Sequence, residues 1–199
     1  MSSVMTAEIA AAAARLVVEE GMEYGPAKRR AARTLGKHST RSAEMPDNAT
    51  VEDEVRAYLS LFCADTQPGE LAALREVAAH WMARLADHRP HVTGAVWRGT
   101  ATRLSCVHLQ LFCDDSKSAE IAMLNQGIDF DIGSINGPRG VPVDLLSLSS
   151  PCLALGEAVT VFLTVLDHDD LRGGLKPDAS GHTQRGDLAA LRRLMEAAT

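Results

Sequence analysis

Two residues that can bind a metal or carry a reactive thiol lie two positions apart in one apolar segment. Cys106 and His108 occur in the run 104–112, which is rich in apolar and β-branched residues. Alternate positions of a strand project from the same face, so a strand here presents the thiol and the imidazole together. Asp144, in an apolar segment further along the chain, adds a carboxylate. These three are the candidate catalytic and metal-binding residues.

A thiolate, an imidazole and a carboxylate suit a particular class of metal. Such a set favours zinc or manganese over magnesium, which prefers oxygen ligands. Two other interpretations are open. Cys106 can be a small buried thiol beside a hydrogen-bonded His108 on a sheet face. It can also be a nucleophile that His108 activates, although no oxyanion hole or orienting acid can be assigned to it.

The segment 94–99, just before this strand, carries two glycines and an arginine. Glycines let backbone amides approach a phosphate, and an arginine can pair with it. The candidate nucleotide- and phosphate-binding residues are Gly94, Ala95, Arg98, Gly99 and Ser105. The structural alternative is an ordinary glycine-containing connection between two strands.

Together these residues resemble the signature of the nucleotidyltransferase superfamily of the DNA-polymerase-β type, in its small, minimal-domain form. In that family a Gly-Ser turn and an Arg-Gly pair precede a strand that carries Asp-x-Asp. Here Ala95 stands in place of the serine, and Cys106 and His108 stand in place of the two aspartates. Asp144 matches the third carboxylate, which the family supplies from a later strand. The resemblance covers residues 94–148.

The resemblance implies a nucleotidyltransferase-like fold whose metal site is altered. In the family, two cations held by clustered carboxylates bridge the triphosphate and stabilise the attacking and leaving oxygens. With both aspartates replaced, we expect a nucleotide- or anion-binding, regulatory module without the family's magnesium-dependent transfer. The alternative is an active transferase or hydrolase that uses a different metal at Cys106, His108 and Asp144.

The net charge of −6 is unevenly distributed. Residues 26–41 contain six basic and no acidic residues, so this segment is +6 and the rest of the chain is −12. Such a segment can recognise an anionic partner, either nucleic acid or an acidic protein, and a solvated helix face is the structural alternative. No aromatic residue interleaves the basic run, which disfavours stacking on single-stranded nucleic acid.

A second polar segment, residues 167–187, is rich in aspartate, histidine and glycine. Loops longer than about 12 to 15 residues are often functional or disordered. This one follows the most β-prone run of the chain, so its start is expected at a sheet end. Together with Arg98 it would form the walls of a substrate site, and a solvated loop is the alternative.

Hydrophobic periodicity predicts helices first and strands later. Helices are expected over 6–20, 26–35, 50–64, 69–88, 119–124 and 188–195. Strands are expected over 91–96, 104–112, 128–132, 141–148 and 159–166, with a hairpin turn at Asn136-Gly137. This order predicts an α+β fold with a mixed sheet of four to five strands and flanking helices. Residues 1–49 would be a helical N-terminal extension with a linker, and residues 50–199 the nucleotidyltransferase-like domain.

The cysteine spacing and the hydropathy of the chain indicate in which cellular compartment the protein is expected. The four cysteines include no CxxC pair, so reduced thiols are expected. No apolar run reaches the roughly 18 to 20 residues that a membrane helix needs, and residues 1–18 lack the pattern of a secretory signal. The sequence therefore predicts a cytoplasmic protein that is not inserted in a membrane.

Overall fold

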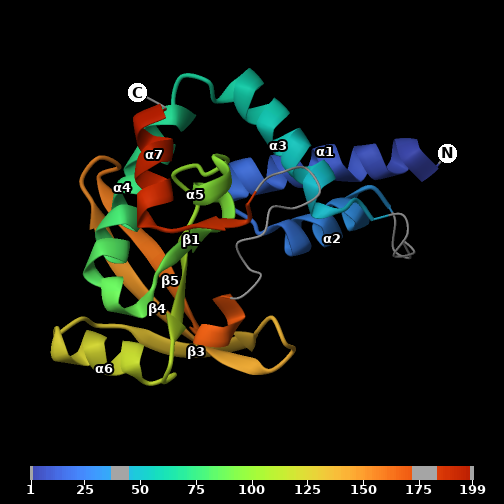
Figure 1. The fold of residues 1–199 in the computed structure, drawn as a ribbon. Coiled ribbons are helices and arrows are strands. Elements are labelled where there is room, and N and C mark those ends of the chain that lie inside the picture. Colours follow the sequence, from blue (N-terminus) through green and yellow to red (C-terminus); the bar gives the residue numbers. More distant parts are fainter. Residues whose placement is uncertain (1, 37–44, 172–182, 198–199) are drawn as a thin grey trace. The chain divides into compact units, whose positions relative to one another are not determined.

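The computed structural model describes residues 2–36, 45–171 and 183–197 of the 199-residue chain (Figure 1). The chain divides into two compact units. Unit 1 comprises Met1–Pro68 and Thr102–Leu104, and unit 2 comprises Gly69–Ala101 and Ser105–Thr199. The predicted order of helices first and a sheet later is confirmed, and the fold is α+β.

The described residues of unit 1 include the helices α1 (Ser2–Glu20), α2 (Tyr24–Thr34) and α3 (Asn48–Phe62). Helix α1 packs against both of the others. Its buried stripe includes Ile9 and Ala13, which pack with Ala27 of α2 and with Val51 and Val55 of α3. Small side chains let helix backbones approach closely, so this core is compact although it holds few large residues.

Helix α3 begins earlier than its sequence pattern predicts. Thr50 and Asp53 approximate a capping box, but the residue that caps the helix is Asp47, whose carboxylate accepts a hydrogen bond from the Thr50 amide at 2.7 Å. The hydrogen bonds from Thr50 lower the pKa of the Asp47 carboxyl. The cap and the helix belong to unit 1, whereas the sequence boundary at residue 50 assigns this helix to the second domain.

Unit 2 contains a mixed sheet. Among the described residues its six strands are β1 (His91–Thr93), β2 (Val107–Cys113), β3 (Asp131–Asn136), β4 (Pro142–Cys152), β5 (Glu157–Asp167) and β6 (Arg185–Gly186). Their order in space is β3-β4-β5-β2-β1-β6. The central strands β2 and β5 are parallel, and every other neighbouring pair is antiparallel.

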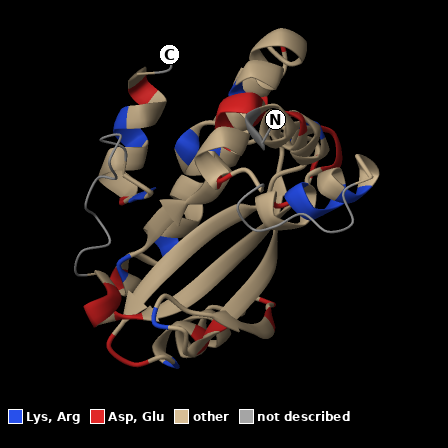
Figure 2. Ribbon diagram, turned by 90° about the vertical axis from the view of Figure 1, so that its right-hand side faces the viewer, with Lys and Arg blue, Asp and Glu red and all other residues tan. Residues whose placement is uncertain are grey.

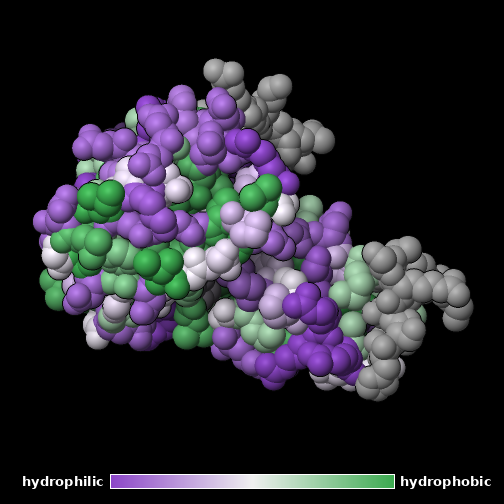
Figure 3. All heavy atoms as spheres, turned by 90° about the horizontal axis from the view of Figure 1, so that it is seen from below, coloured by the Kyte–Doolittle hydropathy of each residue, from purple (hydrophilic) through white to green (hydrophobic). Residues whose placement is uncertain are grey.

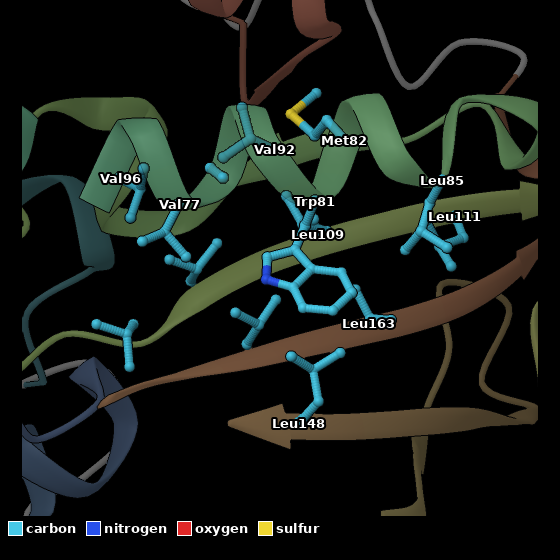
Figure 4. Close-up of a cluster of buried hydrophobic side chains, with 14 of the residues drawn as sticks. Val77, Trp81, Met82, Leu85, Val92, Val96, Leu109, Leu111, Leu148 and Leu163 are labelled. Atoms are coloured by element: carbon cyan, nitrogen blue, oxygen red, sulfur yellow. The ribbon is translucent and has the colours of Figure 1, made fainter. Parts of the chain in front are cut away.

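In the described part of unit 2, four α-helices and two short 3-10 helices accompany this sheet. They are α4 (Gln67–Arg84), η2 (Ala86–His88), α5 (Gly94–Arg98), α6 (Ser118–Asn125), η3 (His168–Leu171) and α7 (Leu188–Ala197). The α-helices all contribute buried side chains to one core, among them Trp81, Val96, Met123 and Leu191. Figure 4 shows α4 lying across β2 and β5, with Trp81 between the helix and Leu163.

Alternation along β2 divides its side chains between the two faces of the sheet. Val107, Leu109 and Leu111 are fully buried in the core beneath α4, on what we call the covered face. His108 and Gln110 point to the other side, which we call the open face, and both are half-buried. Figure 2 looks onto the sheet from the side opposite α4 and shows its strands uncovered by the helices of unit 2.

The strand predicted over 91–96 is wrong in its second half. Strand β1 ends at Thr93, and residues 94–98 form the short helix α5. Gly94 has a φ of 71°, a left-handed conformation that interrupts the strand and that glycine adopts without strain. Val96 then turns into the core and is fully buried. A helix of five residues is too short to produce a helical period, so the sequence pattern could not separate it from the strand.

Two further strand assignments also differ from the prediction. The strand expected over 128–132 occupies Asp131–Asn136, because Ile128 and Phe130 pack against the core on the way out of α6. The hairpin turn at Asn136-Gly137 is confirmed by a 2.8 Å hydrogen bond from the Gly137 amide to the Val141 carbonyl. The sixth strand, β6, has two residues and was not predicted.

Apolar side chains gather on one part of the surface. Figure 3 shows them over α6 and β3, where Ile121, Leu124, Ile132 and Ile135 are exposed. Strand β3 is an edge strand, and each of its residues is exposed. None of the helices in the described part of the chain combines the length and the apolar character needed to cross a membrane.

Candidate ligand site on the open face of the sheet

His108 and Gly94, which the sequence pattern singles out, are neighbours in the structure. Thr93 pairs with His108 across β1 and β2, and Gly94 follows Thr93 directly. A Cβ atom placed on Gly94 would lie 3.7 Å from Cδ2 of His108, an ordinary contact distance. The glycine is therefore required by its positive φ and not by crowding. The predicted glycine turn and the predicted histidine thus meet at the start of β2.

The glycine at the other end of the segment has a structural role. Gly99 ends α5 in a left-handed conformation, with a φ of 85°. Its amide and that of Thr100 both donate to the Ala95 carbonyl, at 2.9 and 3.0 Å. This is the hydrogen bonding of a helix C-terminus. Because both amides are used in this way, neither is directed at a phosphate.

Asp144 does not meet Cys106 and His108. The pairing of β4 with β3 and β5 places Asp144 on the same face as the buried Leu146, which is the covered face, whereas His108 points to the open face. The Asp144 carboxylate instead receives Lys117 Nζ at 3.1 Å. Within the described residues, no group of three or more His, Cys, Asp or Glu side chains could hold a metal ion. The predicted three-ligand set is not assembled there.

The parallel pairing of the central strands gives His108 a different neighbour. His108 lies opposite Phe162 of β5, and the two rings stack with centroids 5.2 Å apart and an interplanar angle of 22°. Both side chains are half-buried. Their contact depends on two segments more than fifty residues apart in the chain, so the local sequence pattern does not indicate it. The pair forms an aromatic wall on the open face.

Arg185 of β6 reaches across the same face. It pairs with Thr93, and its guanidinium carbon lies 5.6 Å from the centre of the Phe112 ring. Nε and Nη1 of Arg185 are buried and have no hydrogen-bond partner. Burial lowers the pKa of Arg185, and the charge of Asp170 opposes this shift. A guanidinium stays protonated under such conditions, so the open face contains a partly dehydrated cation.

Gln110 adds a second polar group without a partner. It lies between His108 and Phe112 on the same face of β2, and its Oε1 is buried without a hydrogen bond. The side chain opposite Gln110 is His91, whose Nδ1 is 2.9 Å from the Arg89 carbonyl. His91 is thus already engaged at this nitrogen. Buried polar atoms in folded proteins are normally paired, so an unpaired acceptor and unpaired donors on one face call for an explanation.

Acidic residues gather at one end of this face. Because β2 and β5 are parallel, their carboxyl ends meet, and Asp114 lies near η3 at this edge (Figure 2). Arg139, from the hairpin between β3 and β4, binds Asp170 at 2.6 Å and lies 3.7 Å from Asp167. Asp114 lies 3.7 Å from Nδ1 of His168. Residues 172–182 of the predicted polar loop lie outside the described residues.

The comparisons with known proteins add no relative. No protein-family model, no curated protein and no solved structure matches the chain significantly. Arg185 belongs to the polar segment 167–187 that the sequence suggested as a wall of a substrate site, whereas Gln110 and Phe162 were not singled out in the sequence. Arg185 lies in a two-residue strand, and the other two acquire their significance only through the pairing of distant strands.

Proposed function

We propose that unit 2 is a binding module for a phosphate-bearing ligand, with a nucleotide as the first class to test, and that the ligand lies on the open face of the sheet. The observation that carries this proposal is that Nε and Nη1 of the half-buried Arg185 are buried without a hydrogen-bond partner. Guanidinium groups bind phosphate through paired, charge-assisted hydrogen bonds. A phosphate would supply a missing acceptor to Nε or to Nη1, paired with Nη2.

The surroundings of Arg185 support a ligand larger than a simple ion. Gln110 Oε1 can accept a hydrogen bond from an N–H or O–H group of the same ligand. The stacked pair of His108 and Phe162 lies further along the face. Phe112 is four positions after His108 in β2, a distance of about 13 Å by the rise of a strand. A ligand that contacts both ends would therefore be extended, as nucleotides are.

The resemblance to nucleotidyltransferases supports the choice of nucleotides as probes. It does not support the family's magnesium-dependent transfer, because Cys106 and His108 replace two of the oxygen ligands and Asp144 lies on the covered face. The proposed role is therefore binding or regulation. We also propose that the fold is nucleotidyltransferase-like and that the protein is cytoplasmic.

Isothermal titration of the full chain with ATP, CTP, GTP and UTP, with and without a divalent cation, tests the proposal. At least one nucleotide should bind, and Arg185→Met should weaken its binding at least tenfold, which corresponds to about 1.4 kcal/mol. Arg185→Lys keeps the charge but lacks the planar fork, so it should restore binding only in part.

The matched control is Arg193→Met, which removes an exposed arginine from α7. It should bind nucleotide as the unmodified protein does. If none of the four nucleotides binds, or if Arg185→Met and Arg193→Met behave alike, the proposal is wrong.

A second candidate function rests on helix α2. Among its basic residues, Lys28 binds the Pro46 carbonyl and Asn48, and Arg30 pairs with Glu20. Two further arginines of this helix, Arg29 and Arg33, are exposed, and no hydrogen bond or ion pair joins their side chains to other residues in the described part of the chain. These lie four residues apart, so they project from one side of α2. We propose this pair as the contact for an anionic partner.

Binding of a short DNA duplex, followed by fluorescence anisotropy over a range of salt concentrations, tests this second function. Binding through phosphates weakens steeply with salt. The double variant Arg29→Gln/Arg33→Gln should lose binding, whereas Arg56→Gln, a control whose arginine is paired with Glu52, should keep it. Salt-independent binding, or no binding, would rule out DNA as the partner.

A further inference from the structure

A second buried arginine of unit 2 lies on the opposite side of the sheet from Arg185. Arg75, in the middle of α4, is only 8% exposed. Its Nε donates to the Val96 carbonyl of α5 at 3.3 Å. A Cβ atom placed on Gly99 would lie 3.6 Å from its Nη2, so the guanidinium lies against the glycine that ends α5. Arg75 was not among the candidate residues of the sequence.

The positive charge of Arg75 is not balanced by an acid. Among the described residues, the structure records a single hydrogen bond for this side chain, to a neutral carbonyl, and no ion pair. Burial is the only influence that shifts the pKa of Arg75, which it lowers, and no neighbouring carboxylate opposes it. The carbonyls at the end of α5 offset part of the charge. An unpaired buried charge nevertheless costs several kcal/mol, so a counterion is expected.

A second unpartnered group lies next to the same glycine. Thr100 is 3% exposed, and its hydroxyl oxygen is buried without a hydrogen-bond partner. Its backbone amide is already bonded to Ala95, so the position of the residue is fixed. Gly99 thus has a guanidinium on one side and an unpaired hydroxyl as its next residue. Both the guanidinium and the hydroxyl can donate a hydrogen bond to an oxyanion. The structure records no hydrogen bond between the two groups.

We propose that a small oxyanion of the phosphate type binds between the Arg75 guanidinium and the Thr100 hydroxyl, beside Gly99. The anion accepts hydrogen bonds from both groups and neutralises the buried charge. Gly99 is suited to this place because its left-handed backbone excludes most side chains. The site is distinct from the open face, and its existence does not depend on the function proposed there.

Thermal unfolding of the full chain in phosphate and in chloride, at equal ionic strength, provides the first test. Phosphate should raise the Tm progressively with its concentration, since only the folded state binds it. Thr100→Val removes the hydroxyl but keeps the shape of the side chain. Without phosphate this variant should be as stable as the unmodified protein or more stable, because a buried unpaired group is lost.

With phosphate, the same variant should show a dissociation constant raised about tenfold. Arg75→Lys, which keeps a charge but loses Nη1 and Nη2, should weaken the effect further, and its circular dichroism spectrum reports whether it is folded. If Thr100→Val destabilises the protein in phosphate-free buffer, the hydroxyl is already paired, for example with a water molecule, and the site is wrong. A phosphate response that is unchanged in both variants would also overturn it.

The background variant Arg185→Met separates this site from the open face. In that background the phosphate response should persist and should still fall on Thr100→Val. A response abolished by Arg185→Met alone places the anion on the open face and overturns the Arg75 site. Titration with a nucleotide then distinguishes free phosphate from the phosphate of a larger ligand. If the nucleotide response depends on Arg75 and inorganic phosphate gives none, the site does not take a free oxyanion and the proposal fails.

Discussion

The buried polar side chains that the described strands of unit 2 carry differ between the two faces of the sheet. On the covered face, Ser150 is 4% exposed and accepts a 2.9 Å hydrogen bond from the indole nitrogen of Trp81. On the open face, Gln110 and Arg185 bury polar atoms that have no partner. A face that only has to pack a core pairs what it buries. The unpaired atoms of Gln110 and Arg185 are the basis of the binding role proposed for the open face.

The largest expected effect separates the faces at two successive residues of β5. Leu163→Ala on the covered face removes a fully buried side chain beneath Trp81, and a loss of about 3 kcal/mol in the free energy of unfolding is expected. Thr164→Ala, whose side chain points to the open face, should cost less than about 1 kcal/mol. Urea denaturation measures both. Equal losses would mean that the open face is as fully packed as the covered one.

A smaller effect is expected at the paired polar group. Ser150→Ala leaves the buried indole N–H of Trp81 without an acceptor, which should cost about 1 to 2 kcal/mol. The neighbouring Ser149→Ala, on the opposite face and exposed, should stay within about 0.5 kcal/mol of the unmodified protein. Denaturant midpoints decide the matter, and a neutral Ser150→Ala would show that this hydrogen bond does not contribute to the core.

On the open face, removing an unpaired polar group should raise the free energy of unfolding, whereas the substitutions on the covered face lower it. Without ligand, Arg185→Met removes a buried cation that has unpaired N–H groups and keeps apolar contact with Phe112, so stability should rise by about 1 kcal/mol. The loss of the contact between the cation and the ring opposes part of this gain. Arg193→Met should leave the Tm unchanged. A lower Tm for Arg185→Met would assign Arg185 a structural role.

The smallest effect is expected at Gln110, whose unpaired group is neutral. Gln110→Leu should raise stability by about 0.5 kcal/mol without ligand, because the buried acceptor is removed and the size of the side chain is nearly kept. Gln110→Glu, which places a charge in the same position, should lower it. Calorimetry of the three proteins in phosphate-free buffer gives the comparison. A destabilised Gln110→Leu would show that the amide is already paired.

Much of the architecture follows from local pattern. The stripes of α1, α3 and α4 and the apolar runs of β2 and β5 are long enough for their periods to be recognised, and they lie close to where they were predicted. The wrong secondary-structure predictions occur where an element is short or where a residue packs against the core instead of joining a strand. Residues 94–98 form one and a half turns of helix, and Ile128 turns into the core instead of joining a strand.

The site was less predictable than the fold for a physical reason. Gly94 and His108 could be placed together because their strands are neighbours along the chain. The contact of His108 with Phe162 and the reach of Arg185 to Phe112 depend on which distant strands pair, and one sequence does not specify this. Asp144 is the opposite case. Its spacing in the sequence is consistent with the family pattern, but the register of β4 places it on the covered face, away from His108.

The parallel pairing at the centre of the sheet also has a consequence for synthesis. Strand β2 can pair with β1 as soon as it leaves the ribosome, but its other neighbour, β5, begins to pair with it only 54 residues later (Val161 minus Val107). At about 5 to 20 residues per second, this interval lasts roughly 3 to 11 s. During that time one edge of β2 stays unpaired in the nascent chain. Ribosome-bound chains stalled before β5 should therefore be cut by protease near β2, and those stalled after it should be protected.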